Sequence, residues 1–152
     1  MSIWPPYLAA GIRVDSISDD WRVVDVSMGL HRFNTNAVGT QFGGSLYSMC
    51  DPFYMLQLMR ILGSDYNVWD QAAEIRFAAP GKGRVYVHFE ISDEFVEDVL
   101  EAAASGEKVL RWLECEVVDG DGAMIAEVRK LIYIRLKREK RPGAEEATAT
   151  PR

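Results

Sequence analysis

Hydrophobic and polar residues alternate along several short segments of the chain, which is the pattern of half-buried β-strands. In one of them, Val24, Val26, Met28 and Leu30 fall on one face, and the residues between them are Asp, Ser and Gly. Similar extended segments recur along the chain, and most are bounded by glycine, proline or aspartate turns. We therefore predict six strands, near residues 12–17, 24–30, 73–79, 85–91, 109–118 and 123–136.

Between residues 44 and 62 the hydrophobic period changes to three or four residues, which predicts an α-helix. This segment is apolar around nearly its whole circumference, so the helix should be buried on several sides. Asp51 and Pro52 interrupt it. Because the apolar period continues on both sides, we predict one kinked helix. The alternative is that Asp51 caps a second helix that Pro52 opens.

Proline within a helix also frees a carbonyl group. Pro52 has no N–H to donate to the carbonyl of Ser48, four residues earlier. We expect this carbonyl to help hold a water molecule beside Asp51.

The order of the elements predicts an α+β fold in which an antiparallel six-stranded sheet wraps around one long buried helix. A second, short helix should follow Ser92 and Asp93, which can cap it. Residues 1–136 are expected to form one domain. Residues 137–152 are charged and lack apolar periodicity, so we expect a disordered tail there.

Composition and charge exclude several kinds of partner. The chain has 152 residues, 48% of them hydrophobic, which is enough to fill one core. Its net charge of -6 argues against nucleic acid or an anionic membrane surface, because both require a basic face. The sequence shows neither a membrane-spanning run nor a secretory signal, so the expected location is the cytoplasm and the expected partner is a small molecule or a protein.

The cysteines and histidines predict no metal site. Cys50 and Cys115 lie in apolar-rich segments and are expected to be buried free thiols in a reducing compartment. His31 and His88 complete no metal-ligand spacing with them. We therefore expect no metal and no cofactor.

The most specific motif of the chain lies at the start of the predicted central helix. From Asn36 to Pro52 the sequence reads NAVGTQFGGSLYSMCDP. This run resembles the pattern N-x-x-G-T-x-F-G-G-S-L-x-S-M-x-D-P of hotdog-fold acyl-CoA thioesterases, particularly the phenylacetate-degradation type and less characterised proteins related to it. Over residues 7–136 the element order is also similar to theirs. The resemblance implies the hotdog fold and hydrolysis of an acyl-CoA or acyl-carrier thioester.

The resemblance also implies roles for three residues. The Gly43 N–H would polarise the thioester carbonyl, Asp51 would activate water or attack directly, and Asn36 would help to place the water or the carbonyl. A helix N-terminus has unpaired N–H groups that can stabilise charge on a carbonyl oxygen, and a carboxylate in an apolar helix suits a general base. For Asn36, hydrogen bonding within its own loop is the alternative.

The spacing of Gly43 and Asp51 predicts a site shared between two subunits. Eight residues of helix correspond to about 12 Å along the axis, so one thioester cannot readily touch both groups of one chain. We therefore expect the Gly43 N–H of one subunit to face Asp51 of another across a two-fold axis. The assembly would be a homodimer or a dimer of dimers.

Phe42 stands where many hotdog thioesterases have histidine. This difference removes a polar group near the carbonyl, and it argues against the hotdog dehydratases, whose chemistry requires a histidine together with the helix acid. It also leaves a second hypothesis open. In that hypothesis the chain is a non-catalytic hotdog protein that binds an acyl group or acyl-CoA, with its site closed by Phe42.

Several further residues are candidates for substrate binding. Phe53 and Trp69 could line an acyl pocket, with core packing as the alternative. Lys82 and Arg84 lie beside a glycine turn and could meet the phosphates of coenzyme A, with exposed turn charges as the alternative. The remaining candidates lie next to the expected carbonyl site, and they are Phe42, Gly44 and Ser48.

Overall fold

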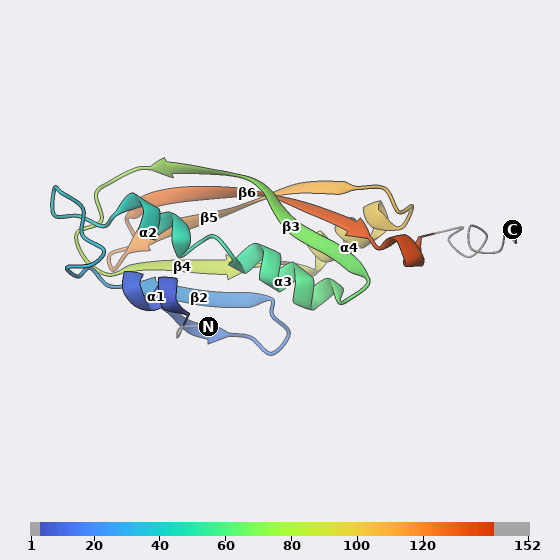
Figure 1. Ribbon diagram of the computed structural model, residues 1–152, viewed down its shortest axis with the longest axis horizontal. Coiled ribbons are helices and arrows are strands. Elements are labelled where there is room, and N and C mark those ends of the chain that lie inside the picture. Colours follow the sequence, from blue (N-terminus) through green and yellow to red (C-terminus); the bar gives the residue numbers. More distant parts are fainter. Residues whose placement is uncertain (1–3, 142–152) are drawn as a thin grey trace, which may run out of the picture.

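The computed structural model describes residues 4–141, which contain a six-stranded sheet. The strands lie in the order β1-β2-β4-β5-β6-β3, and all neighbours are antiparallel (Figure 1). The strands are β1 Ile12–Ile17, β2 Val23–Met28, β3 Tyr66–Phe77, β4 Val85–Glu90, β5 Val109–Asp119 and β6 Met124–Leu136. The predicted α+β class and six-stranded antiparallel sheet are therefore confirmed.

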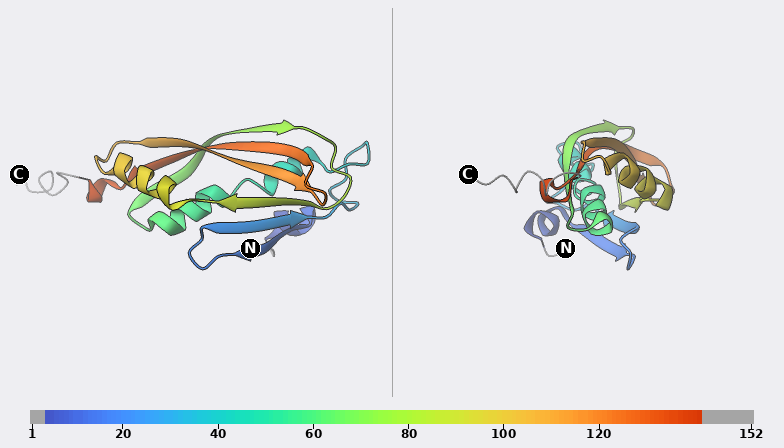
Figure 2. Two further views of the ribbon diagram at one scale, coloured as in Figure 1. Left: turned by 180° about the vertical axis from the view of Figure 1, so that it is seen from behind. Right: turned by 90° about the vertical axis from the view of Figure 1, so that its right-hand side faces the viewer.

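The helices occupy the inside and the rim of this sheet. They are α1 Pro5–Ala10, α2 Gly43–Ser48, α3 Phe53–Leu62 and α4 Asp93–Ala103. The sheet curls around α2 and α3, which follow one another along its concave face (Figure 2). As predicted, Ser92 caps α4, since its hydroxyl accepts the Phe95 N–H at 3.2 Å. No helix within residues 4–141 is long and apolar enough to cross a membrane.

Strand β4 shows how alternation builds the core. Val85, Val87 and Phe89 are buried, and the residues between them are exposed. The Phe89 ring packs on Phe53 and Tyr54 of α3, with ring centroids 4.9 and 5.3 Å apart. Burial of this apolar surface holds α3 against the sheet. Both cysteines of the chain are buried free thiols, as predicted.

The central helix is broken, so the prediction of one continuous kinked helix is wrong. α2 ends at Ser48, and α3 begins at Phe53 after a turn. Pro52 explains the break, because it has no N–H for the helical ladder and its ring would clash with the preceding turn. The Ser48 carbonyl accepts the Tyr7 hydroxyl at 3.2 Å. A carbonyl oxygen can accept two hydrogen bonds, so the expected water beside Asp51 stays a prediction.

A bulge in β3 changes which of its side chains face the helices. The pairing with β6 shifts register between Asp70 and Ala72, so Gln71 is an extra residue. One inserted residue reverses the alternation. Val68 and Asp70 face the helices before the bulge, and Ile75 faces them after it. Asp70 lies five residues before Ile75, so without the bulge the two side chains would lie on opposite faces of the sheet.

The predicted disordered tail, residues 137–152, is described only in part. Arg138–Lys140 form the short 3-10 helix η1, and the Lys137 N–H donates to the Asp65 carbonyl at 2.8 Å. Residues 142–152 lie outside the described residues.

Candidate active site

A cavity of about 400 Å³ lies at the N-terminal end of α2. Gly43 and Leu46 of α2 form part of its wall, and residues from the loop before α2 and from the segment after β3 form the rest. None of the hydrogen bonds found in residues 4–141 uses the Gly43 N–H. Because the first N–H groups of a helix have no intrahelical partner, this donor is available to a ligand in the cavity.

Asn36 shapes the loop that leads to this cavity. Its side-chain oxygen accepts the N–H groups of Val38 and Thr40 at 3.1 and 3.0 Å. Its amide nitrogen donates to the Thr40 hydroxyl at 2.8 Å and to the Gln41 carbonyl at 3.2 Å. Asn36 also lines the cavity, but these four bonds all lie within its own loop. The geometry therefore favours the loop-forming role over direct action on a substrate.

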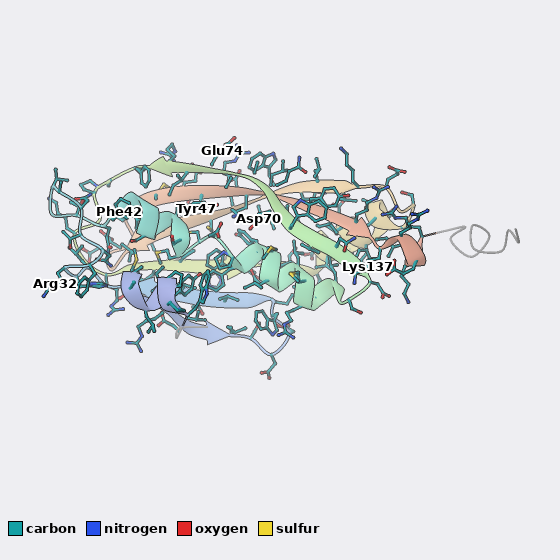
Figure 3. The ribbon with its side chains drawn as sticks, viewed as in Figure 1. Arg32, Phe42, Tyr47, Asp70, Glu74 and Lys137 are labelled. Atoms are coloured by element: carbon teal, nitrogen blue, oxygen red, sulfur yellow. The ribbon has the colours of Figure 1, made fainter. Side chains whose placement is uncertain are left out.

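Two phenyl rings cover the glycine pair at the start of α2. A Cβ atom on Gly43 would lie 2.8 Å from Cζ of Phe77, and one on Gly44 would lie 2.4 Å from Cε1 of Phe42. Glycine permits this close approach of the rings to the helix backbone. Phe42 is 56% exposed, and Figure 3 shows it where α2 begins. The rings therefore border the position from which the Gly43 N–H would be reached.

Asp51 lies in the turn after α2 and does not line this cavity. Its Oδ1 atom accepts hydrogen bonds from Lys130 Nζ and from the Tyr47 hydroxyl, both at 2.7 Å. Lys130 Nζ is also 3.1 Å from Oδ2 of Asp70. Figure 3 shows Tyr47 and Asp70 beside the break between α2 and α3. The Asp51 side chain is 47% exposed, so the expected enclosure in an apolar helix is not observed.

The charges of this cluster follow from its burial and hydrogen bonds. The Lys130 side chain is only 1% exposed. Burial alone would lower the pKa of Lys130, but hydrogen bonds with Asp51 and Tyr47 and the charge of Asp70 raise it above its ordinary range. Burial raises the pKa of Tyr47, as does its hydrogen bond to Asp51. Lys130 is therefore cationic and Tyr47 neutral near pH 7, so both donate hydrogen bonds to Asp51.

Asp70 is the more enclosed of the two acids. Burial raises the pKa of its carboxyl, and the neighbouring Lys130 charge opposes that shift. Its Oδ1 atom is buried without a hydrogen-bond partner. Lys130 is thus the cation that compensates a partly buried carboxylate on β3 and a half-exposed one after α2.

Two of the predicted substrate-binding residues lie away from both places. Phe53 is fully buried and packs in the core against Tyr7 and Phe89, so it fills the alternative role. Trp69 lies between two residues that face the helices, and therefore on the outer face of the sheet. There it stacks on Tyr133, with ring centroids 3.7 Å apart. Neither residue lines the cavity beside α2, and their role in an acyl pocket stays a prediction.

The other predicted residues lie closer to the glycine pair. The Ser48 hydroxyl donates to the Gly44 carbonyl at 2.8 Å, within α2. Lys82 is exposed and follows Gly81, which lines the cavity. Arg84 donates to the Ser27 hydroxyl at 3.2 Å and remains exposed. Both cations are exposed, and their contact with coenzyme A phosphates stays a prediction.

Residues 1–134 match the model of a protein family described as "Domain of unknown function (DUF4442)". The chain belongs to the DUF4442 family. No curated protein matches the sequence significantly.

The DUF4442 chain is similar in fold to several solved structures. A Pseudomonas aeruginosa protein of unknown function, described as a probable thioesterase, has a TM-score of 0.75 at 20% identity, over 86% of this chain and 87% of that one. A Shewanella oneidensis protein described as a candidate thioesterase has a TM-score of 0.63 at 23% identity, over 90% of each chain. Thioesterase HI1161 from Haemophilus influenzae has a TM-score of 0.65 at 9% identity, over 89% and 85%. At such identities the likeness shows the fold, and it confirms the predicted hotdog architecture.

The motif of this DUF4442 chain did not indicate Lys130 or Asp70. A signal for Lys130 exists in β6, where the lysine stands among alternating apolar residues that are all buried. These residues are Ala126, Val128, Ile132 and Ile134. A cation at a core-facing strand position is rarely found without a buried anionic partner. The pattern therefore marks Lys130, but it does not identify its partners.

Proposed function

We propose that this DUF4442 protein hydrolyses an acyl-CoA or acyl-carrier thioester. The observation that carries the proposal is the unpartnered N–H of Gly43, which begins α2 and lines a cavity of about 400 Å³. The turn after the same helix supplies a carboxylate, Asp51, with one oxygen that accepts no hydrogen bond from the described residues. Proteins of the same fold that are named as thioesterases support this proposal.

In the proposed reaction, the thioester carbonyl oxygen accepts the Gly43 N–H. Asp51 removes a proton from water, which attacks the carbonyl carbon, or Asp51 attacks that carbon itself. Negative charge then develops on the carbonyl oxygen, where a fixed donor at a helix N-terminus lowers the barrier. When water attacks, cleavage of the C–S bond releases the free acid, and the leaving thiolate takes up the proton that Asp51 removed from water. When Asp51 attacks, cleavage of the C–S bond releases the thiolate and leaves a mixed anhydride on Asp51, which water then hydrolyses to the free acid.

The proposed active site is composite. Gly43 begins α2 and Asp51 lies beyond its end, and only Gly43 lines the cavity. The six residues of α2 alone span about 9 Å along the axis, and Asp51 lies beyond them, which is too far for one thioester carbon. We assign the Gly43 N–H to one subunit and Asp51 to a second subunit, related by a two-fold axis.

The exposed groups around the cavity suit the remainder of the substrate. Phe42 and Gly44 lie where the thioester would enter, and Lys82 and Arg84 carry exposed positive charge beside the segment that lines the cavity. Positively charged side chains of this kind bind phosphate groups. We assign Lys82 and Arg84 to the phosphates of coenzyme A, and Asn36 to the shape of the loop.

A non-catalytic acyl-binding protein is the second candidate function. One observation favours it: the residues that line the cavity include neither an acid nor a base, and Phe42 occupies the place where many relatives of this fold have histidine. In that case the cavity would hold an acyl group or acyl-CoA without turnover.

A substrate panel separates the two functions. Purified protein is offered short, medium, long and aromatic acyl-CoAs, and free thiol is measured. We expect turnover of at least one class, at a kcat of about 1–10³ s⁻¹. Absence of turnover across the panel, together with acyl-CoA binding in calorimetry, would instead establish the binding function.

Subunit mixing tests the composite site. Gly43→Pro, which removes the N–H, and Asp51→Asn are co-expressed with different affinity tags, and the mixed dimer is isolated. Its first subunit supplies Asp51 and its second supplies the Gly43 N–H, so one of two composite sites is intact. We expect recovery to about half of the wild-type kcat, although each variant alone is inactive. If mixed dimers stay as inactive as the parents, both groups act within one chain.

A further inference from the structure

We infer that Lys130 is a positioning residue of the active site, which fixes one oxygen of Asp51 and leaves the other to the reacting water. The inference rests on the proposed function, since it assigns a task to Lys130 in that reaction. It starts from an unusual feature of the core: the fully buried lysine of β6 is aimed at the break between α2 and α3.

All N–H groups of Lys130 have partners. A lysine ammonium carries three donors. Its Nζ atom is 2.7 Å from Asp51 Oδ1, 3.1 Å from the Tyr47 hydroxyl oxygen and 3.1 Å from Asp70 Oδ2. No donor remains for a substrate, and the side chain is buried. Lys130 therefore acts through Asp51 and does not touch the reacting atoms.

The two oxygens of Asp51 are not equivalent. Oδ1 accepts from both Lys130 and Tyr47, and no described residue donates to Oδ2. Hydrogen bonds with ionised groups are strong and directional, so they fix the orientation of the carboxylate. Because Asp51 is half exposed, Oδ2 is the oxygen that water can reach.

This anchor matters because Asp51 lies outside regular structure. The residue belongs to a turn between two helices, and its N–H donates to the Tyr47 carbonyl at 3.0 Å. This bond holds the main chain of Asp51 but does not orient its carboxylate. Lys130 instead belongs to β6, which is paired on both sides by β5 and β3. Asp70 holds Lys130 from β3, just before the bulge. Through Lys130, the sheet thereby orients a carboxylate that the main chain of the turn does not orient by itself.

The variants must separate positioning from folding. Lys130→Met alone leaves the partly buried Asp70 without a cation, so it risks unfolding the protein. The double variant Lys130→Met/Asp70→Asn removes one positive and one negative charge, so the cluster keeps its net charge of about -1. Tyr47→Phe removes the other donor to Asp51 and leaves the lysine in place. As a matched control, Arg129→Met removes a neighbouring cation of β6 that bridges Glu74 and Glu114.

The test is a kinetic cycle with Asp51→Asn. We expect Lys130→Met/Asp70→Asn to lower kcat about 10- to 100-fold with KM within about two-fold, because a misplaced base loses its attack geometry. Tyr47→Phe should lower kcat in the same way but less, and Arg129→Met should leave it unchanged. In the Asp51→Asn background, the Lys130 and Asp70 changes should cost less than about two-fold more, since the groups act as one unit.

The outcomes are distinct for the two proposals. Full loss in Asp51→Asn with unchanged kcat in both the double variant and Tyr47→Phe overturns the positioning role and leaves the proposed function intact. Losses that multiply in the Asp51→Asn background also overturn it, because Lys130 would then act independently of Asp51. Wild-type protein that turns over no thioester, or Asp51→Asn that keeps wild-type kcat, overturns the proposed function and the inference with it.

Discussion

Replacing Asp51 with asparagine is expected to lower kcat for thioester hydrolysis about 10²- to 10⁴-fold. The asparagine keeps an oxygen that can accept from Lys130 Nζ and from the Tyr47 hydroxyl, the two donors that lie 2.7 Å from Oδ1 of Asp51. The turn should therefore keep its shape. An amide, however, neither takes a proton from water nor attacks a carbonyl carbon. Thiol release under saturating acyl-CoA measures the loss, and KM should change little.

Asp98→Asn provides the matched control for this prediction. Asp98 lies on α4, and its Oδ2 atom is 2.8 Å from Nε of Arg111. Like Asp51→Asn, the control therefore replaces a carboxylate that is paired with a basic side chain. Its kcat should equal that of the wild type. If Asp51→Asn retains more than about one tenth of the wild-type kcat while Asp98→Asn is unaffected, Asp51 is neither base nor nucleophile.

The sheet is predictable from the sequence wherever one face is buried and the strand is regular. In β4, alternation over residues 85–91 predicts the observed strand Val85–Glu90 almost to the residue. In β3, the alternation that begins at residue 73 is correct, but the strand starts at Tyr66. The bulge at Gln71 reverses the inward face, so the two halves of β3 do not share one period. The alternation of neighbouring residues therefore does not predict that the two halves form one strand.

The candidate site also contains residues that the local sequence indicates and residues that it does not. The glycine pair and Asp51 belong to one short motif, so local sequence is enough to mark them. Lys130 and Asp70 meet Asp51 only because β3 pairs with β6 in a particular register, between residues far apart in the chain. Sequence shows a lysine on an apolar strand face, but not which acids neutralise it. At Pro52 the sequence does not distinguish a kinked helix from two helices, because both have the same apolar period.

Gly43→Pro is expected to lower kcat about 10²- to 10³-fold, equivalent to about 3–4 kcal/mol of transition-state stabilisation, because it removes the proposed donor to the carbonyl oxygen. The exchange suits the backbone. Gly43 is the first residue of α2, where proline is well tolerated and its missing N–H has no helical partner. Phe42 before it is extended, with φ -67° and ψ 126°, as a residue before proline prefers.

Gly43→Ala is the matched variant, because it adds the same Cβ atom and keeps the N–H. In both variants the Cβ would lie 2.8 Å from Cζ of Phe77, whose ring is 55% exposed and can turn aside. Thiol release by Gly43→Ala should therefore stay within about three-fold of the wild type, while Gly43→Pro loses most of its activity. Equal losses in the two variants would mean that space beside Phe77, and not the N–H, limits the reaction. Equal retention would mean that another donor stabilises the charge on the carbonyl oxygen.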